Sequence, residues 1–120
     1  MKVLVVDDES LIRKALVRAF KGKGHFVEDV DNGITGFEKL ISNEYDLVFL
    51  DILMPGKSGP ELMKDRHLFK SKSYILMSAY SGEHNLETAN SLNADMFLPK
   101  PFDDIFEIVK LAEKVVECKG

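Results

Sequence analysis

The sequence has little of several features, and each shortage excludes a class of protein. One cysteine, Cys118, occurs in 120 residues, so no internal disulfide can form and a reducing cytoplasm is the expected compartment. No apolar run approaches the roughly 18–20 residues that a membrane-spanning helix needs, and the apolar start turns acidic after Val6, too early for a signal peptide. The chain also lacks basic surplus, with 16 Lys and Arg against 20 Asp and Glu. We therefore expect a cytoplasmic chain that binds no membrane and, by itself, no nucleic acid.

The composition is typical of one globular domain. Hydrophobic residues make up 45% of the chain and charged residues 30%, which excludes a disordered chain. A length of 120 residues fits a single domain and is enough to bury one core. We therefore expect residues 1–120 to form one domain.

Short apolar runs alternate with longer stretches of helical period. The runs are Lys2–Val6, Phe26–Val30, Leu47–Leu50, Tyr74–Met77 and Met96–Leu98. The helical patterns cover residues 11–20, 34–41, 62–69, 86–90 and 105–116. Nearly continuous apolar runs are typical of strands buried on both faces of a parallel sheet. The alternation predicts an α/β fold, a (βα)₅ doubly wound sheet of five parallel strands.

Capping residues agree with these boundaries. Ser10 is expected to cap the first helix, and Gly22 and Gly24 to end it. Pro60 suits the first turn of the third helix.

Polar residues stand where the predicted strands end. They are Asp7 and Asp8 after the first strand, Asp51 at the end of the third, Ser78 and Ala79 after the fourth, and Lys100 after the fifth. Each of these residues, taken by itself, is also common in turns and helix caps. Ligands of open α/β sheets bind at the carboxyl ends of the strands, so together these residues predict a site.

The chemistry of that site follows from its charges. Carboxylates held so close together need a cation to stay ionised in a partly buried pocket. Oxygen ligands suit Mg²⁺, with Mn²⁺ as the alternative ion. Asp51, beside the cation and Lys100, is placed to attack phosphorus, and Ser78 to donate a hydrogen bond to a phosphoryl oxygen.

These residues belong to motifs, and with them the chain resembles the receiver domain of two-component response regulators, the CheY-like fold. The matching segments are Val3–Glu9, Asp46–Pro55, Gly59, Met77–Ala79 and Phe97–Phe102. The resemblance runs from Val3 to about Val116. It implies a flavodoxin-like sheet order and a phosphorylation-dependent switch in a phosphorelay, with slow self-dephosphorylation and no other enzymatic activity.

The resemblance also implies the roles of the acidic residues. Asp51 is expected to accept the phosphoryl group from a histidine kinase or a histidine phosphotransfer protein. Asp8 and Asp51 are expected to ligate Mg²⁺ directly, together with the backbone carbonyl of Leu53. Asp7 is expected to act largely through water.

The remaining motif residues are implied to bind and transmit the phosphoryl group. Ser78 and Lys100 would bind its oxygens, with the backbone N–H of Ala79, and the Lys100–Pro101 bond would be cis. Phe97 takes the switch position, where Tyr is common. A downstream protein would then bind the face of the fourth helix, fifth strand and fifth helix.

Other positions depart from the family pattern or stay open. Asn93 stands where Gly is usual, and Asn tolerates the left-handed conformation. Leu53 and Tyr80 are bulky neighbours of the path of the hydrolytic water. The basic residues of the first helix are either a solvated face or a partner surface. The histidines show no ligand spacing and are expected at or near the surface; they are His25, His67 and His84.

Competing functions remain beside the receiver. The chain is either a free-standing receiver or the N-terminal receiver part of a longer regulator whose output domain is missing. An aspartate-nucleophile phosphatase needs a second Asp two residues after the nucleophile, where Leu53 stands. A flavodoxin-like cofactor binder would need a loop that cradles phosphate after the first strand, but the acidic loop there would repel it.

Overall fold

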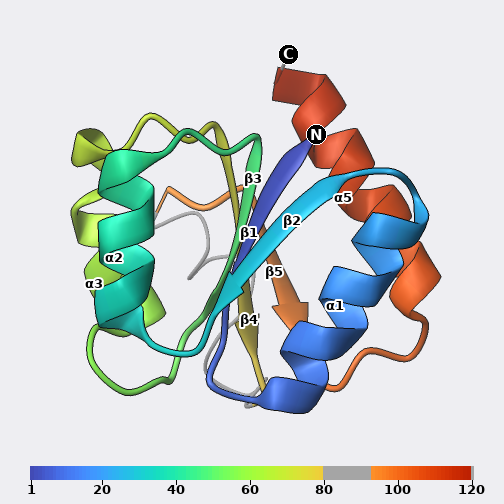
Figure 1. Ribbon diagram of the computed structural model, residues 1–120, viewed down its shortest axis with the longest axis horizontal. Helices are drawn as coiled ribbons and strands as arrows, with labels where there is room; N and C mark the ends of the chain where they lie inside the picture. The colour runs from blue at the N-terminus through green and yellow to red at the C-terminus, as the bar shows by residue number, and fades with distance from the viewer. Residues whose placement is uncertain (80–92, 120) are drawn as a thin grey trace.

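A computed structural model describes residues 1–79 and 93–119 (Figure 1). The elements are β1 (Lys2–Val6), α1 (Ser10–Gly22), β2 (Phe26–Val30), α2 (Gly33–Ser42), β3 (Leu47–Asp51), α3 (Gly59–Lys64), the short 3₁₀ helix η1 (Arg66–Leu68), β4 (Ser73–Ser78), β5 (Met96–Pro99) and α5 (Ile105–Lys119). The helix predicted at residues 86–90 lies outside the described residues.

The strands form one parallel sheet in the order β2-β1-β3-β4-β5. Helices α1 and α5 cover one face, and α2 and α3 cover the other (Figure 1). The predicted α/β class with five parallel strands is confirmed. β2 lies on one side of β1, and β3, β4 and β5 follow on the other side. The carboxyl ends of β1 and β3 therefore flank the point where the strand order reverses, which is where open α/β sheets bind ligands.

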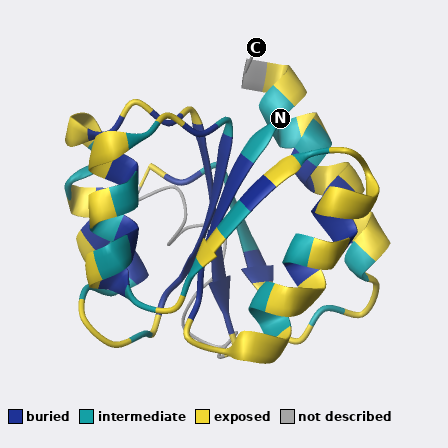
Figure 2. Ribbon diagram, viewed as in Figure 1, coloured by how far each residue is buried: buried dark blue, intermediate teal, exposed yellow. Residues whose placement is uncertain are grey.

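Burial follows position in the sheet (Figure 2). Every residue of β3 and β4 is buried, whereas the edge strand β2 mixes buried with exposed residues. The reason is that central strands are covered on both faces. β3 and β4 also run further than the apolar pattern predicts, because Asp51 and Ser78 keep parallel partners in the sheet, Met77 and Pro99 respectively.

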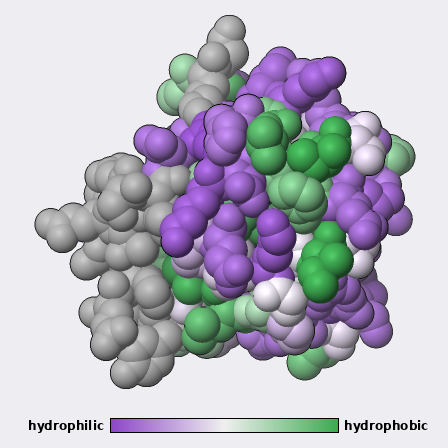
Figure 3. Space-filling view, turned by 90° about the vertical axis from the view of Figure 1, so that its left-hand side faces the viewer, coloured by the Kyte–Doolittle hydropathy of each residue, from purple (hydrophilic) through white to green (hydrophobic). Residues whose placement is uncertain are grey.

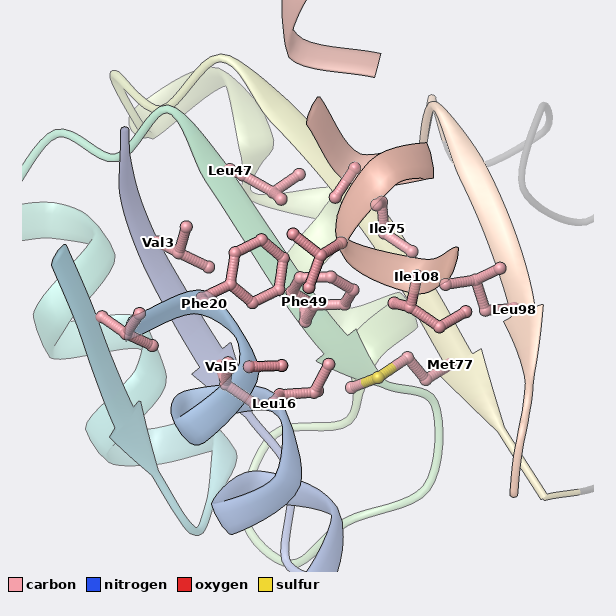
Figure 4. Packing of buried hydrophobic residues seen from close by; sticks show 14 residues of the cluster. Val3, Val5, Leu16, Phe20, Leu47, Phe49, Ile75, Met77, Leu98 and Ile108 are labelled. Carbon is pink, nitrogen blue, oxygen red and sulfur yellow. The ribbon is translucent and has the colours of Figure 1, made fainter. Parts of the chain in front are cut away.

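Two hydrophobic clusters hold the layers together. Successive side chains of a strand point to opposite faces, so Val3 and Val5 pack towards α1 and α5 while Leu4 and Val6 pack on the other side. Figure 4 shows the cluster that contains Val3 and Val5. In it, the rings of Phe20 and Phe49 pack edge to face, with 5.6 Å between their centroids. The site therefore rests on strands fixed from both sides.

The helix starts differ in part from the prediction. The expected cap at Ser10 is wrong: Ser10 is the first residue of α1, and the N-cap is Glu9, whose side chain makes no capping hydrogen bond. The backbone N–H of Glu9 instead donates to the carboxylate of Asp7 at 2.8 Å. Pro60 does lie in the first turn of α3, behind a capping box of Ser58 and Glu61. The third helix ends at Lys64, earlier than its pattern predicts.

The loop between β3 and α3 is pinned to the start of α2. The backbone N–H of Gly33 donates to the carbonyl of Pro55 at 3.1 Å. A Cβ at Gly33 would lie 1.6 Å from the carbonyl oxygen of Lys57, so only glycine permits this approach. The ammonium of Lys57 also lies 4.1 Å from the ring centroid of Phe37. This loop carries Leu53 past the end of β3.

The surface over α2 and α3 is mixed. Figure 3 views the side that lies at the left in Figure 1 and shows hydrophobic groups among hydrophilic ones. Ile34 and Ile41 are exposed apolar residues of α2, and scattered residues of this kind are ordinary on protein surfaces. Within the described parts of the chain, none of the helices combines the length and apolar character that crossing a bilayer requires.

Candidate functional site

Three aspartates meet at the carboxyl edge of the sheet. Asp7 follows β1 directly and Asp51 is the last residue of β3. Both are buried, with 0% and 3% of their surface exposed, whereas Asp8 is exposed. Carboxylate oxygens of all three lie within 4.8 Å of one another. Such a cluster of oxygen donors fits a hard divalent cation such as Mg²⁺.

Lys100 is brought to the same place from the end of β5. Its backbone N–H donates to the carbonyl of Ser78 at 2.8 Å, and its bond to Pro101 is cis, as the resemblance implied. Its ammonium nitrogen lies 3.0 Å from Asp7 Oδ2 and 3.3 Å from Asp51 Oδ2, and only 3% of the side chain is exposed. The buried carboxylates thus share a buried cation.

Glu9 is a third partner of Lys100 that the sequence did not reveal. Its Oε1 lies 2.7 Å from Lys100 Nζ, which is closer than either aspartate oxygen. Any of three consecutive acidic residues after a strand could point away from the site. The available signal was that Glu9 follows two aspartates at a strand end, but it does not identify the side chain that reaches Lys100.

A cavity of about 340 Å³ opens above the aspartates. Its lining residues are Asp8, Glu9, Asp51, Leu53, Ser78, Ala79 and Lys100. Ser78 is buried at 2% exposure, and Leu53 is exposed at the rim, with its backbone N–H 3.4 Å from Asp51 Oδ1. The structure therefore brings the residues after β1, β3, β4 and β5 together around one cavity. Tyr80 lies outside the described residues.

The charges of the cluster oppose ionisation of Asp51. Burial and the negative charge of Asp7 raise the pKa of Asp51 from 3.8 to about 7, although Lys100 works in the other direction. Burial also opposes the charge of Lys100, but its hydrogen bonds to Glu9 and Asp7 and the charges of Asp7 and Asp51 outweigh burial and raise the pKa of Lys100. One ammonium group is therefore too little positive charge for this pocket, and a further cation would fit it.

Arg13 is hydrogen-bonded to the backbone just after β1. This residue belongs to the basic group of α1, yet its guanidinium donates to the backbone carbonyl of Asp7 at 2.8 Å and to the carboxylate of Asp29 at 3.0 Å. Its side chain is 17% exposed. Arg13 thus ties β1, β2 and α1 together beside the site.

The other residues singled out in the sequence lie away from the cavity or outside the described chain. Phe97, on β5, is partly buried against the cluster on the α2 and α3 side. Asn93 has a φ of 61°, the left-handed conformation expected for it. His25 hydrogen-bonds to the N-terminal amine and to Glu113, and His67 is exposed. His84 lies outside the described residues.

Sequence relatives match most of the chain. The transcriptional regulatory protein ResD of Bacillus subtilis is 32% identical over 101 residues, which are 84% of this chain and 42% of ResD. The DNA-binding transcriptional regulator NtrC of Escherichia coli is 38% identical over 115 residues, which are 95% of this chain and 24% of NtrC. The chain therefore spans less than half the length of these curated relatives.

Solved structures agree with the fold. The response regulator TrrA of Thermotoga maritima, in complex with Mg²⁺-BeF, has a TM-score of 0.80 at 35% identity, covering 95% of this chain and 97% of that one. The receiver domain of the Francisella response regulator 1452 has a TM-score of 0.87 at 24% identity, covering 99% and 98%. At that identity the second likeness concerns the fold alone.

The family follows from these matches together with the site. Residues 3–113 match the response regulator receiver domain, and the match includes the three aspartates and Lys100. The acidic cluster lies at the strand ends where the order of the sheet reverses. The chain belongs to the family of response regulator receiver domains.

Proposed function

We propose that this chain is a phosphorylation-controlled signalling switch that accepts a phosphoryl group on Asp51. The observation that carries the proposal is the meeting of Asp7, Asp8 and Asp51 with the buried ammonium of Lys100. Of these residues, Asp8, Asp51 and Lys100 line one open cavity. The family match supports it, since receiver domains are generally signalling switches that bind Mg²⁺ at an acidic pocket.

The transfer needs a nucleophile and charge neutralisation. A carboxylate oxygen of Asp51 forms a bond to phosphorus while the bond from phosphorus to an imidazole nitrogen of the donor breaks, and the imidazole leaves with the electron pair. The donor would be a phosphohistidine of a histidine kinase or a histidine phosphotransfer protein. When bound, Mg²⁺ would neutralise charge on the phosphoryl oxygens.

Each residue around Asp51 has one proposed role. Asp8 and Asp51 would ligate Mg²⁺ together with the backbone carbonyl of Leu53, and Asp7 would act through water. The Lys100 ammonium would bind a phosphoryl oxygen, since it already lies 3.3 Å from Asp51 Oδ2. The buried Ser78 hydroxyl and the backbone N–H of Ala79 would bind the others; both residues line the cavity.

Phosphorylation would then change the surface that a partner binds. Lys100 follows β5 and its backbone is hydrogen-bonded to Ser78 at the end of β4, so new contacts to the phosphoryl group would act on both strands. Phe97 lies on β5 as the proposed switch aromatic. A downstream target would bind the face that includes β5 and α5. Phosphorylation would shift an existing equilibrium between two conformations of this face and would not create a new fold. The fourth helix of that face lies outside the described residues.

A second candidate is the same switch as the receiver part of a longer regulator. The observation that favours it is length: the chain corresponds to 42% of ResD and 24% of NtrC. Sequencing the gene beyond the codon for Gly120 distinguishes it from a free-standing receiver, and either outcome leaves the chemistry of Asp51 unchanged.

Incubation with a small phosphodonor and Mg²⁺ tests the proposal. We expect the intact mass to rise by one phosphoryl group, and fragmentation after borohydride reduction of the acyl phosphate to locate it at Asp51. Omitting the donor is the control. A phosphoryl group on Ser78 or on a histidine would contradict the assignment.

The phosphorylated form is expected to persist longer than in a fast-signalling receiver. Hydrolysis needs a water in line with the bond between phosphorus and Asp51, and something must position it. Leu53, 67% exposed at the rim of the cavity, offers no side-chain hydrogen bond. The resemblance to the family implies that Tyr80 flanks the same path, where its ring would be large enough to block the water.

Polar groups on this path should shorten the lifetime. We expect Leu53→Asn and Tyr80→Glu each to speed the decay of phosphorylated chain severalfold, measured after removal of the donor in Mg²⁺. Leu68→Asn, a change at another exposed leucine, is the control and should have no effect. Decay of the parent within seconds, or slower decay of the double variant, would refute this explanation.

A further inference from the structure

Lys100 contacts carboxylates of the same cluster that would hold a divalent cation. Its ammonium nitrogen contacts Oδ2 of Asp7 at 3.0 Å and Oδ2 of Asp51 at 3.3 Å. Together with Asp8, these two residues form the carboxylate cluster that fits a divalent cation. A divalent cation and the ammonium therefore compete for the same carboxylates, and they repel each other because both are positive.

The Lys100 ammonium is held in the site and does not readily move into solvent. Its side chain is 3% exposed, and its backbone is held by the hydrogen bond to Ser78. Its ammonium is charged, as lysine side chains ordinarily are at neutral pH. The ammonium thus needs a counter-ion that the cation does not claim.

Glu9 is such a counter-ion. Its Oε1 lies 2.7 Å from the ammonium nitrogen, closer than the oxygens of Asp7 and Asp51. Its carboxylate is not a member of the group formed by the three aspartates, and its side chain is 54% exposed. The backbone hydrogen bond from Glu9 to Asp7, 2.8 Å long, holds the residue beside the site.

We propose that Glu9 is a positioning residue that retains the Lys100 ammonium while a divalent cation binds Asp7, Asp8 and Asp51. Glu9 thereby strengthens binding of the cation without ligating it. This inference rests on the proposed function, because it assumes that the three aspartates bind Mg²⁺. It also implies that a phosphoryl group on Asp51 must draw Lys100 partly away from Glu9.

Calorimetric titration with Mg²⁺ alone tests the inference. Glu9→Gln keeps the shape of the side chain and removes its charge, and we expect Mg²⁺ binding to weaken about fivefold, as for an ion pair with one half-exposed partner. Glu38→Gln removes one charge from an exposed residue of α2 and should leave the affinity unchanged.

A thermodynamic cycle separates positioning from simple attraction between Glu9 and Mg²⁺. In a Lys100→Met background no ammonium competes, so Glu9→Gln should change the affinity by less than about twofold if Glu9 acts through Lys100. Equal effects of Glu9→Gln in both backgrounds would overturn the proposal, since attraction through space does not depend on Lys100.

A spectroscopic readout covers the case in which Lys100→Met fails to fold. The NMR signal of the Lys100 ammonium should survive in the Mg²⁺-loaded parent, where Glu9 protects it from exchange with water, and should broaden in Mg²⁺-loaded Glu9→Gln. An unchanged signal overturns the inference. If the parent binds Mg²⁺ and Asp8→Asn does not, the proposed metal site stands even then; a parent that binds no Mg²⁺ refutes both.

Discussion

Replacing Asp51 by asparagine is expected to abolish phosphorylation and to stabilise the unphosphorylated fold at neutral pH. An amide has no carboxylate oxygen to attack phosphorus, so labelling by the phosphodonor should fall to the background level. The stabilisation arises because a carboxylate that is 3% exposed next to Asp7 is costly to ionise. Lys100 would keep Asp7 and Glu9 as partners in the variant.

The stabilisation should depend on pH with a definite sign. Burial and Asp7 raise the pKa of Asp51 to about 7 in the folded chain, against 3.8 ordinarily. Between these values the folded chain binds more protons than the unfolded chain, so the free energy of unfolding falls as the pH rises. The difference corresponds to at most about 4 kcal/mol above pH 7, and we expect about 2 kcal/mol because water and Lys100 relax around the charge.

Urea unfolding at two pH values measures this effect. Asp51→Asn should exceed the parent in unfolding free energy at pH 7.5, and the gain should nearly vanish at pH 4. Asp103→Asn, at an exposed position, controls for the loss of one negative charge. A gain that is equal at both pH values, or a loss of stability at pH 7.5, would contradict the electrostatic explanation.

Removal of the metal should suppress phosphorylation of the parent about 100-fold. This factor corresponds to about 2.7 kcal/mol, which is part of the several kcal/mol by which a bound cation stabilises the charge of the transition state. The negative phosphoryl donor must approach three aspartates and Glu9. Among the described residues that line the cavity, Lys100 supplies the positive charge. Excess chelator should therefore slow labelling even though Asp51 is intact.

Asp8→Ala should reproduce the effect of the chelator. Asp8 is exposed, so its loss should leave the fold intact. Lys100 would also keep its ion pairs with Asp7, Glu9 and Asp51. Labelling rates measured by mass across a Mg²⁺ titration should fall in Asp8→Ala and stay normal in Asp31→Ala, an exposed control. Undiminished labelling in excess chelator would show that the acidic cluster is not a metal site.

Much of the fold was predictable because strand burial leaves a local pattern. Strands covered on both faces must be apolar throughout, so the runs at β1 and β3 were legible from the sequence. The predicted ends of β3 and β4 were less accurate, because Asp51 and Ser78 are polar yet remain paired in the sheet. Helix starts were also uncertain, since Ser10 is a good capping residue but the turn before α1 is shaped by Asp7, which accepts the N–H of Glu9.

The sequence by itself determined that Asp7, Asp8, Asp51, Ser78 and Lys100 stand at strand ends, and parallel strands bring such residues to one edge. Only the tertiary structure decided how they pair. Lys100 lies 91 positions from Glu9 in the chain, and no local pattern encodes which of three consecutive acids its ammonium meets at 2.7 Å. The same holds for the raised pKa of Asp51, because burial and the closeness of Asp7 exist only once β1 and β3 lie side by side.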